Sequence, residues 1–389
     1  MIVHDKTLLE NLILVEEARS LQEAGFISKE QVSILKNELP VFKSNTNILV
    51  RLGFFLLGVF LYLSICGVIA LFGLSGINES FFKIVCFIFA IVGFVGAEAL
   101  SYQNYYQHGL EDAFILGSIL NIGIALEIVT DQNELIIATF VAITSFIMYK
   151  RYLHLLSMLV FCCSCSAILF YGLFEFGTIG KTILPFVAMI FAVGFYFFTK
   201  KLNEKTTQYY YHKGILIANS FCLVLFYLSC NYLVVRELSL ELLGDEIAQG
   251  KDIPFTYFFY AFTFIVPAIY LVQALKTKDR ILLWISFLAI AFSIYTIRFY
   301  HSILPIEIAL TLGGVFLFGI AYFSIRKLKD NETGLTFKPD RINNSNAILN
   351  AEALIVASAF GIKPELKPQA SPMDFGGGGF SGGGSGGTF

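Results

Sequence analysis

Ten long apolar runs constrain this chain more than any other feature of its sequence. Each approaches the ~20 residues that a helix needs to cross ~30 Å of hydrocarbon. The backbone groups of a segment in lipid must be hydrogen-bonded within that segment, and the runs are too long for the ~10-residue alternating strands of a membrane barrel. The sequence therefore predicts an all-α, polytopic helical membrane protein with about ten transmembrane helices. The predicted spans are residues 52–74, 81–100, 111–129, 134–149, 153–173, 182–199, 214–235, 255–275, 281–298 and 304–325.

Composition and charge support a membrane protein and predict its orientation. Charged residues make up only 14% of the chain, whereas soluble domains carry about 25%. With ten spans, 22 of the 27 Lys and Arg residues lie on the side of the N-terminus. Because basic residues concentrate on the cytoplasmic side, we expect a multi-pass inner (plasma) membrane protein with both termini cytoplasmic. The net charge of −2 gives no reason to expect nucleic-acid binding.

The sequence divides into four parts. Residues 1–48 are predicted to be a cytoplasmic helical hairpin in which Ser28 and Gln31 form a capping box. This hairpin is too small to fold alone, so it should pack on the membrane domain or on a partner. Residues 49–326 form the predicted ten-helix transmembrane domain, and residues 327–370 a cytoplasmic segment with a short helix.

The last part, residues 371–389, is rich in glycine and is predicted to be a disordered tail. It lacks the lysine and the flanking strand and helix of a phosphate-binding loop. A flexible terminus is the favoured interpretation. The alternative is a docking element whose aromatic side chains bind a partner, through Phe375, Phe380 and Phe389.

Polar residues inside the predicted spans are candidate functional residues, because ionisable groups are costly in hydrocarbon. Those in this chain lie near the ends of spans, where contact with water explains them, or they are asparagines, which commonly bond neighbouring helices. Proton or ion coupling by the acids at the start of span three, together with the acid at the end of span two, is the functional alternative. The candidates are Glu98, Glu111, Asp112, Asn121, Asn219 and Glu307.

Span five places His154, Met158, Cys162 and Cys165 on one helical face. These are the soft ligands that Cu(I) prefers. They extend over about 16 Å of one helix, so no more than two could share an ion without another helix. Core packing is therefore the favoured interpretation, and we expect no metal and no cofactor.

Two cytoplasmic segments resemble each other. Residues 103–113, "QNYYQHGLEDA", match residues 208–218, "QYYYHKGILIA", at an offset of 105. Each precedes a span that enters from the same side, four spans apart. One interpretation is a parallel 4+4+2 repeat, an arrangement that transporters use. The other is that tyrosines are common at membrane interfaces.

Three segments carry a resemblance to a family. They are "AGFISKEQ", "HGLEDAFILGSILNIG" and "IRFYHSILPIEIALTLGGVFLFGIAYFSIRKL". Through them the chain resembles, over about residues 5–328, a group of bacterial multi-pass membrane proteins classed as a domain of unknown function. That group has an N-terminal helical hairpin and an Arg-Phe-Tyr turn before its last helix, although Glu307 differs from the basic or small residue usual there. The glycine-rich tail is separately similar to tails of bacterial envelope proteins.

We expect a non-enzymatic envelope, assembly or scaffold component that binds protein partners through its cytoplasmic head and tail while embedded in the lipid bilayer. The alternative is a small-solute or lipid transporter that uses the region of Glu98, Glu111 and Asp112. An enzyme is the least favoured class, because no Ser–His, paired-Asp or His–metal combination is evident at a suitable depth.

Overall fold

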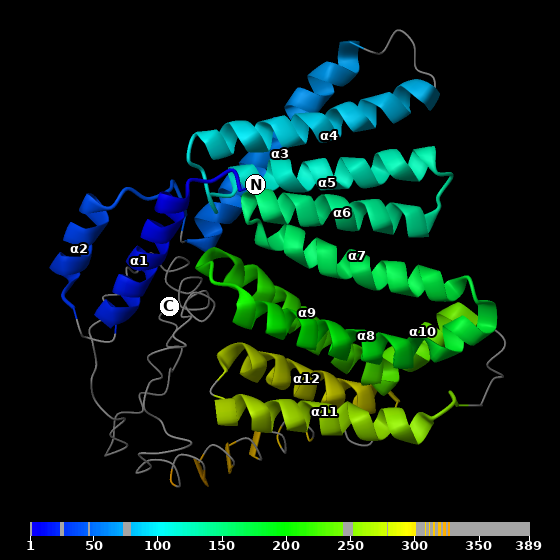
Figure 1. Ribbon diagram of the computed structural model, residues 1–389. Coiled ribbons are helices and arrows are strands. Elements are labelled where there is room, and N and C mark those ends of the chain that lie inside the picture. The colour runs from blue at the N-terminus through cyan, green and yellow to red at the C-terminus, as the bar shows by residue number, and fades with distance from the viewer. Residues whose placement is uncertain are drawn as a thin grey trace, which may run out of the picture.

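The structure is a computed structural model. It describes residues 2–300, except residues 24–26, 46, 73–78, 244–251 and 278, and it also describes isolated positions between 308 and 326. The chain is an all-α, multi-pass membrane protein, as predicted. Within the described residues, nine helices are long and apolar enough to span a membrane (Figure 1). The tenth predicted span, residues 304–325, lies mostly outside the described residues. The nine helices are α3 (Ile48–Phe72), α4 (Glu79–Tyr102), α5 (Leu110–Val129), α6 (Glu134–Tyr152), α7 (Leu155–Phe174), α8 (Gly177–Lys205), α9 (His212–Cys230), α11 (Thr256–Thr277) and α12 (Arg280–Tyr300).

The spanning helices pack as a row of antiparallel neighbours (Figure 1). Helix α5 contacts α3, α4 and α6. Half of the residues in its most apolar stretch are buried, compared with 17% of those in the corresponding stretch of α3. Outward side chains such as Phe60 and Ile190 are 72% exposed, as expected of helices that face lipid. The row continues through α6 and α7 to the pair α8 and α9, and then to α11 and α12.

A glycine allows α4 and α5 to approach closely. A Cβ atom at Gly93 would lie 2.8 Å from the main-chain oxygen of Phe114 and from the main-chain nitrogen of Ser118. Small residues at helix interfaces bring backbones together in this way in membrane proteins. The close pairing fixes the start of α5, where the candidate site lies.

The helical hairpin at the N-terminus consists of α1 (Lys6–Glu23) and α2 (Lys29–Glu38), and its capping box is confirmed. The Gln31 main-chain nitrogen donates to Ser28 Oγ at 3.2 Å, and the Ser28 nitrogen donates to Gln31 Oε1 at 2.8 Å. The hairpin packs on one end of the helix row, which we call the head side (Figure 1). The opposite end is called the far side.

The predicted seventh span ends earlier than expected. The sequence predicts residues 214–235 as this span, followed by an acidic link at 236–254 for which a solvated loop is favoured over an amphipathic surface helix. Instead α9 ends at Cys230, and Asn231 caps a separate short helix, α10 (Tyr232–Leu243), that packs on α8, α9 and α11. The prediction was wrong because hydropathy does not detect Asn231 Oδ1, which accepts from the main-chain nitrogens of Leu233 and Val234 and so starts a new helix.

The order of helix neighbours is similar in the two halves of the row. Helix α5 contacts α3, α4 and α6, and α9 contacts α7, α8 and α11. At corresponding positions, Ala113 on α5 faces Gly58 of α3, and Ala218 on α9 packs with Cys162 of α7. A parallel repeat predicts this correspondence, with α10 inserted in the second half. The repeat itself stays a prediction.

Candidate functional site

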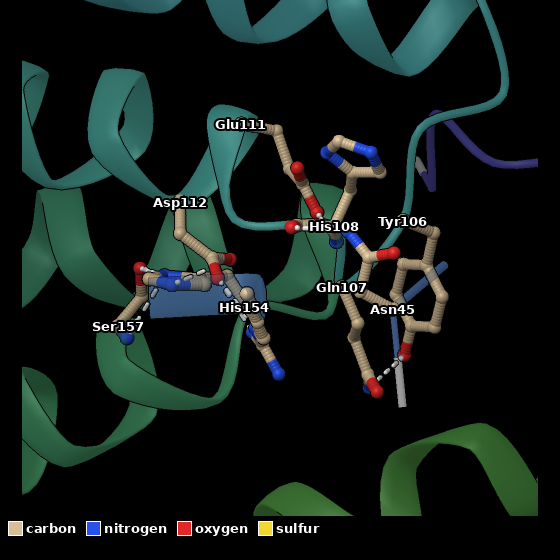
Figure 2. Close-up of polar contacts among 9 residues, drawn as sticks. Asn45, Tyr106, Gln107, His108, Glu111, Asp112, His154 and Ser157 are labelled. Carbon is tan, nitrogen blue, oxygen red and sulfur yellow. Dashed lines mark hydrogen bonds and ion pairs between the residues drawn. The ribbon is translucent and has the colours of Figure 1, made fainter. Parts of the chain in front are cut away.

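A cluster of ionisable residues lies at the head side of α5, next to the turn between α6 and α7 (Figure 2). Gly109 makes this placement possible, because its φ of +110° is costly for other residues and a Cβ there would lie 2.2 Å from the Arg51 main-chain oxygen. Helix α5 then begins at Leu110. Glu111 and Asp112 fall in its first turn, where the helix dipole stabilises negative charge.

Asp112 forms the centre of the cluster. Its Oδ2 accepts from Arg51 Nη2 at 2.6 Å and from Arg51 Nε at 2.9 Å. Its Oδ1 lies 3.2 Å from His154 Nε2. Figure 2 shows Asp112 and His154 facing each other from α5 and from the α6–α7 turn. Asp112 and His154 are both buried, so the cluster joins three parts of the chain that are distant in sequence.

His154 also bonds to the start of α7, and this contact corrects an expectation. Its Nδ1 accepts from the Ser157 main-chain nitrogen at 3.2 Å and lies 2.7 Å from Ser157 Oγ. A Ser–His pair next to an aspartate is therefore present, although none was expected from the sequence. Because Nδ1 accepts the main-chain N–H, the proton of the neutral ring belongs on Nε2, which faces Asp112.

This Ser–His–Asp arrangement lacks what an acyl-transfer site requires. Ser157 is completely buried and does not line the neighbouring cavity. A nucleophile needs a position about 3 Å away for the reacting atom and donors for the oxyanion. The geometry therefore indicates that Ser157 caps a helix and fixes the ring of His154.

The loop before α5 fixes Glu111. The Glu111 Oε1 atom accepts from the His108 main-chain nitrogen at 2.7 Å, and Asn45 Nδ2 donates to the His108 carbonyl at 3.1 Å (Figure 2). Burial lowers the pKa of His108, whose ring packs 4.1 Å from that of Phe54. Burial also raises the pKa of Tyr106 in the same loop to about 12. The rings of Tyr106 and His108 in this loop are therefore uncharged, and the buried carboxylate that the loop contacts belongs to Glu111.

A small cavity lies among these residues. Its volume is about 10 Å³, which is the space that one water molecule needs. Three residues that line it each have a buried side-chain atom with no hydrogen-bond partner among the described residues. These atoms are His4 Nδ1, Ser101 Oγ and Glu111 Oε2. All three residues are 4–5% exposed. Buried polar atoms without partners are rare, so their convergence indicates a site for a water molecule or a mobile proton.

The N-terminal segment forms one side of the cavity through His4. The Val3 main-chain nitrogen donates to the Arg151 carbonyl at 3.0 Å, and the ring of His4 packs edge-on against Phe42 and Tyr106. Burial lowers the pKa of His4 from 6.5 to about 4. The imidazole is therefore neutral at pH 7.

Glu98 lies on the edge of the same region but has its own partners. Its Oε1 accepts from Arg151 Nε and from the Tyr152 hydroxyl, the latter at 2.6 Å. The Arg151 guanidinium also lies 5.8 Å from the centre of the Phe94 ring. Glu98 is thus close to the Glu111–Asp112 region, as the transporter interpretation requires, and its charge is compensated.

The other candidates lie elsewhere. Asn121 Nδ2 donates to the Tyr62 hydroxyl of α3 at 2.9 Å, and Asn219 Oδ1 accepts from Thr199 of α8, so each asparagine joins two helices. Met158 and Cys162 pack against Tyr149. Within the described residues no three His, Cys, Asp or Glu side chains meet as a metal site. Glu307, Phe375, Phe380 and Phe389 lie outside the described residues.

No match to this chain is found among family models, curated proteins or solved structures. The resemblance to a domain of unknown function therefore stays a prediction. The interpretation of the site rests on its geometry.

Sequence reasoning identified Glu111 and Asp112 but missed the residues that complete the cluster. His154 had been grouped with the cysteines of its own helix, whereas its partner is Asp112 on α5. Arg51 and His4 come from segments outside the apolar runs. The available signal was the run "RYLH" between two spans, since a basic residue and a histidine in a tight turn can meet the acids of a neighbouring span.

A second polar network, also missed, lies at the far side around Asn231. Asn231 Nδ2 donates to the Tyr227 hydroxyl at 3.0 Å and to Thr296 Oγ1 at 3.1 Å. The Tyr227 hydroxyl lies 2.9 Å from Ser293 Oγ, which donates to the Thr263 carbonyl at 2.6 Å. This network joins α9, α11 and α12 through side chains that all have partners.

Proposed function

We propose that the protein is a transporter that couples the movement of a small solute to proton binding at the Glu111–Asp112–His154 cluster. The single observation that supports it most is a water-sized cavity lined by three residues with unpartnered polar atoms, His4, Ser101 and Glu111. Glu111 and His154, which also lines the cavity, have side chains that can each gain or lose a proton.

The cluster has the parts that a proton site needs. Asp112 is held by Arg51, so it can keep its charge while a proton moves between neighbouring groups. The Glu111 Oε2 atom retains the capacity for a further hydrogen bond, and the ring of His154 faces Asp112. A water molecule in the cavity would connect Glu111 to its neighbours, and a proton gained by Glu111 would remove a negative charge beside the Arg51–Asp112 pair.

The scaffold interpretation relied on the head and the tail. The described head uses part of its apolar surface within the chain, because Leu9 and Phe42 are buried against Tyr106 and Leu153, whereas Leu14 and Ile34 stay exposed. The tail lies outside the described residues. The geometry of the described part therefore favours the transporter over the scaffold.

The location belongs to the same proposal. We place the protein in a bacterial inner membrane with the head side cytoplasmic, supported by the 22 of 27 basic residues on that side in the ten-span arrangement. The proton site would then face the cytoplasmic leaflet. A fluorescent reporter fused to the N-terminus checks this orientation.

The test uses the full chain in liposomes that contain a trapped pH dye. A panel of amino acids, sugars, nucleosides and carboxylates is added outside, and proton movement is recorded for each solute. We expect at least one solute to move protons in the wild type and none to do so in Glu111→Gln. The control is Glu134→Gln, which changes an exposed acid at the start of α6 on the far side.

An infrared titration of the same proteins makes the test independent of the solute. The wild type should show a carboxyl signal that changes with pH and is missing in Glu111→Gln. If the two spectra are identical and no solute moves protons, the cluster is a structural element and the proposal is wrong.

A further inference from the structure

A large groove opens at the head side, between the α6–α7 pair and the α8–α9 pair, and belongs to no part of the proton site. Its volume is about 630 Å³, within the range of small-molecule and cofactor pockets. The end of α6, the start of α7, the end of α8 and the start of α9 line it. All of these segments lie at the same end of the bundle, where lipid headgroups meet the protein.

The deeper part of the groove is aromatic. Phe146, Phe161, Phe195 and Phe198 line it, and Phe198 is 61% exposed. A bundle in water would not leave such a surface open, but a spanning bundle can present it to the acyl chains of a lipid.

The outer part of the groove is basic and polar. Helices α6 and α8 both run toward the head side, so Lys150 lies one turn beyond Phe146, and Lys205 lies about two turns beyond Phe198. Lys150 Nζ lies 5.6 Å from the centre of the Phe146 ring. Neither lysine forms an ion pair with any carboxylate in the described part of the chain.

Polar groups complete the basic end. Thr206, Thr207 and Gln208, which connect α8 to α9, line the same end of the groove. They supply hydroxyl and amide groups beside the two cations. Apolar depth followed by cations and hydrogen-bonding groups matches one kind of membrane component, an acyl chain that ends in a negatively charged headgroup.

We propose that this groove binds one anionic phospholipid of the head-side leaflet, with its acyl chain against the four phenylalanines and its phosphate between Lys150 and Lys205. A second copy of the chain explains the aromatic depth but not the two unpaired lysines at its end. The proposal is independent of proton coupling, since Lys150 and Lys205 do not line the small cavity.

The test compares two photoactivatable lipids, a phosphatidylglycerol and a phosphatidylcholine, each at a low fraction in phosphatidylcholine liposomes that contain the full chain. The labelled peptides are identified by mass spectrometry. We expect phosphatidylglycerol to label the segments around Phe161 and Phe198 at least tenfold more than phosphatidylcholine does. Equal labelling by the two lipids would overturn the proposal, because it would show ordinary lipid contact.

Matched variants assign the selectivity to the groove. Each lysine near an anionic surface contributes about fivefold in affinity, so Lys150→Gln with Lys205→Gln should reduce phosphatidylglycerol labelling by up to about 25-fold, toward the level of phosphatidylcholine. The control is Lys200→Gln with Lys201→Gln, two exposed lysines of α8 that do not line the groove. If the control pair reduces labelling as much as the groove pair, general surface charge is the cause and the proposal is wrong.

A matched pair of variants tests the phenylalanines that line the deeper part of the groove. Phe198→Ala should reduce labelling, whereas Phe197→Ala, an equally exposed neighbour outside the groove, should leave it unchanged. Proton movement in the same liposomes should be the same for the lysine variants as for the wild type. A lysine variant that loses lipid labelling but keeps proton movement supports the groove and leaves the transport proposal intact.

Discussion

The head-side cluster around Asp112 and the far-side network around Asn231 are both buried and polar, but they differ in how completely their atoms are paired. Around Asn231 the amide, the hydroxyls of Tyr227 and Thr296 and the start of α10 have hydrogen-bond partners. Around Asp112 three residues that line the cavity, His4, Ser101 and Glu111, each keep a side-chain atom without a partner among the described residues. A network whose polar atoms all have hydrogen-bond partners fixes one structure, whereas polar atoms without partners can still bind a water molecule or a proton.

Removal of Asp112 should have the largest effect on stability. Asp112→Ala leaves Arg51 without its ion-pair partner and His154 Nε2 without an acceptor, and breaking a buried ion pair costs up to about 3–5 kcal/mol, less where one partner is partly exposed, as Arg51 is. We expect a large fall in the thermal unfolding midpoint in detergent. Glu127→Ala, at an exposed acid in the last turn of α5, serves as the control and should change little. An equal and small effect of both would show that the Asp112 contacts contribute little.

Asn231 should come second. Asn231→Ala removes the cap of α10, leaves the main-chain nitrogens of Leu233 and Val234 without their acceptor and takes one of its partners from Thr296, at a cost of about 3 kcal/mol. The free energy of unfolding should fall, while proton movement by the protein that remains folded should be unchanged. Loss of proton movement at full stability would assign function to the far side and reverse the comparison.

The same contrast explains what the sequence could predict. Hydropathy alone located the spans, since α5 and α6 lie within three residues of the predicted 111–129 and 134–149. It predicted α9 poorly, because Asn231 is one polar residue within an apolar run and its capping role depends on the local backbone. Lipid exposure determines where spans lie, and single hydrogen bonds determine where they end.

The site was predictable only in part. Glu111 and Asp112 stand out as acids at the start of an apolar run. Their partners Arg51 and His154 lie 61 and 42 positions from Asp112, on either side of it in the sequence. Such pairing follows from the packing of α3, α5 and α7, which one sequence does not reveal.

A fall in pH should weaken the packing of the N-terminal hairpin on the head side of the membrane domain. Because burial lowers the pKa of His4 from 6.5 to about 4, the folded state resists protonation more than the unfolded state does. The contribution of His4 to stability is therefore complete above pH 6.5 and is lost as the pH falls toward 4. Linkage limits the effect to about 3 kcal/mol.

Proteolysis of the α1–α2 segment measured across this pH range tests the effect. His4→Phe keeps ring contacts with Phe42 and Tyr106 but cannot be protonated, so its head should remain protected at lower pH. Identical protection curves for the variant and the wild type would show that other groups control the docking.

The smallest effect on stability should come from the change that matters most for function. In Glu111→Gln the side-chain oxygen can still accept from the His108 nitrogen, and the new amide faces the cavity where the Glu111 Oε2 atom has no partner. The free energy of unfolding should change by less than about 1 kcal/mol. Asn231→Asp makes the reverse exchange in the far-side network. It should cost about 2–3 kcal/mol, because the new carboxylate cannot donate to Tyr227 and Thr296. Thermal unfolding of the two variants measures this difference, and the pH-dye assay measures proton movement. If Glu111→Gln destabilises as much as Asn231→Asp, the head-side cluster is as fully paired as the far-side network, and the distinction between a binding region and a structural one no longer holds.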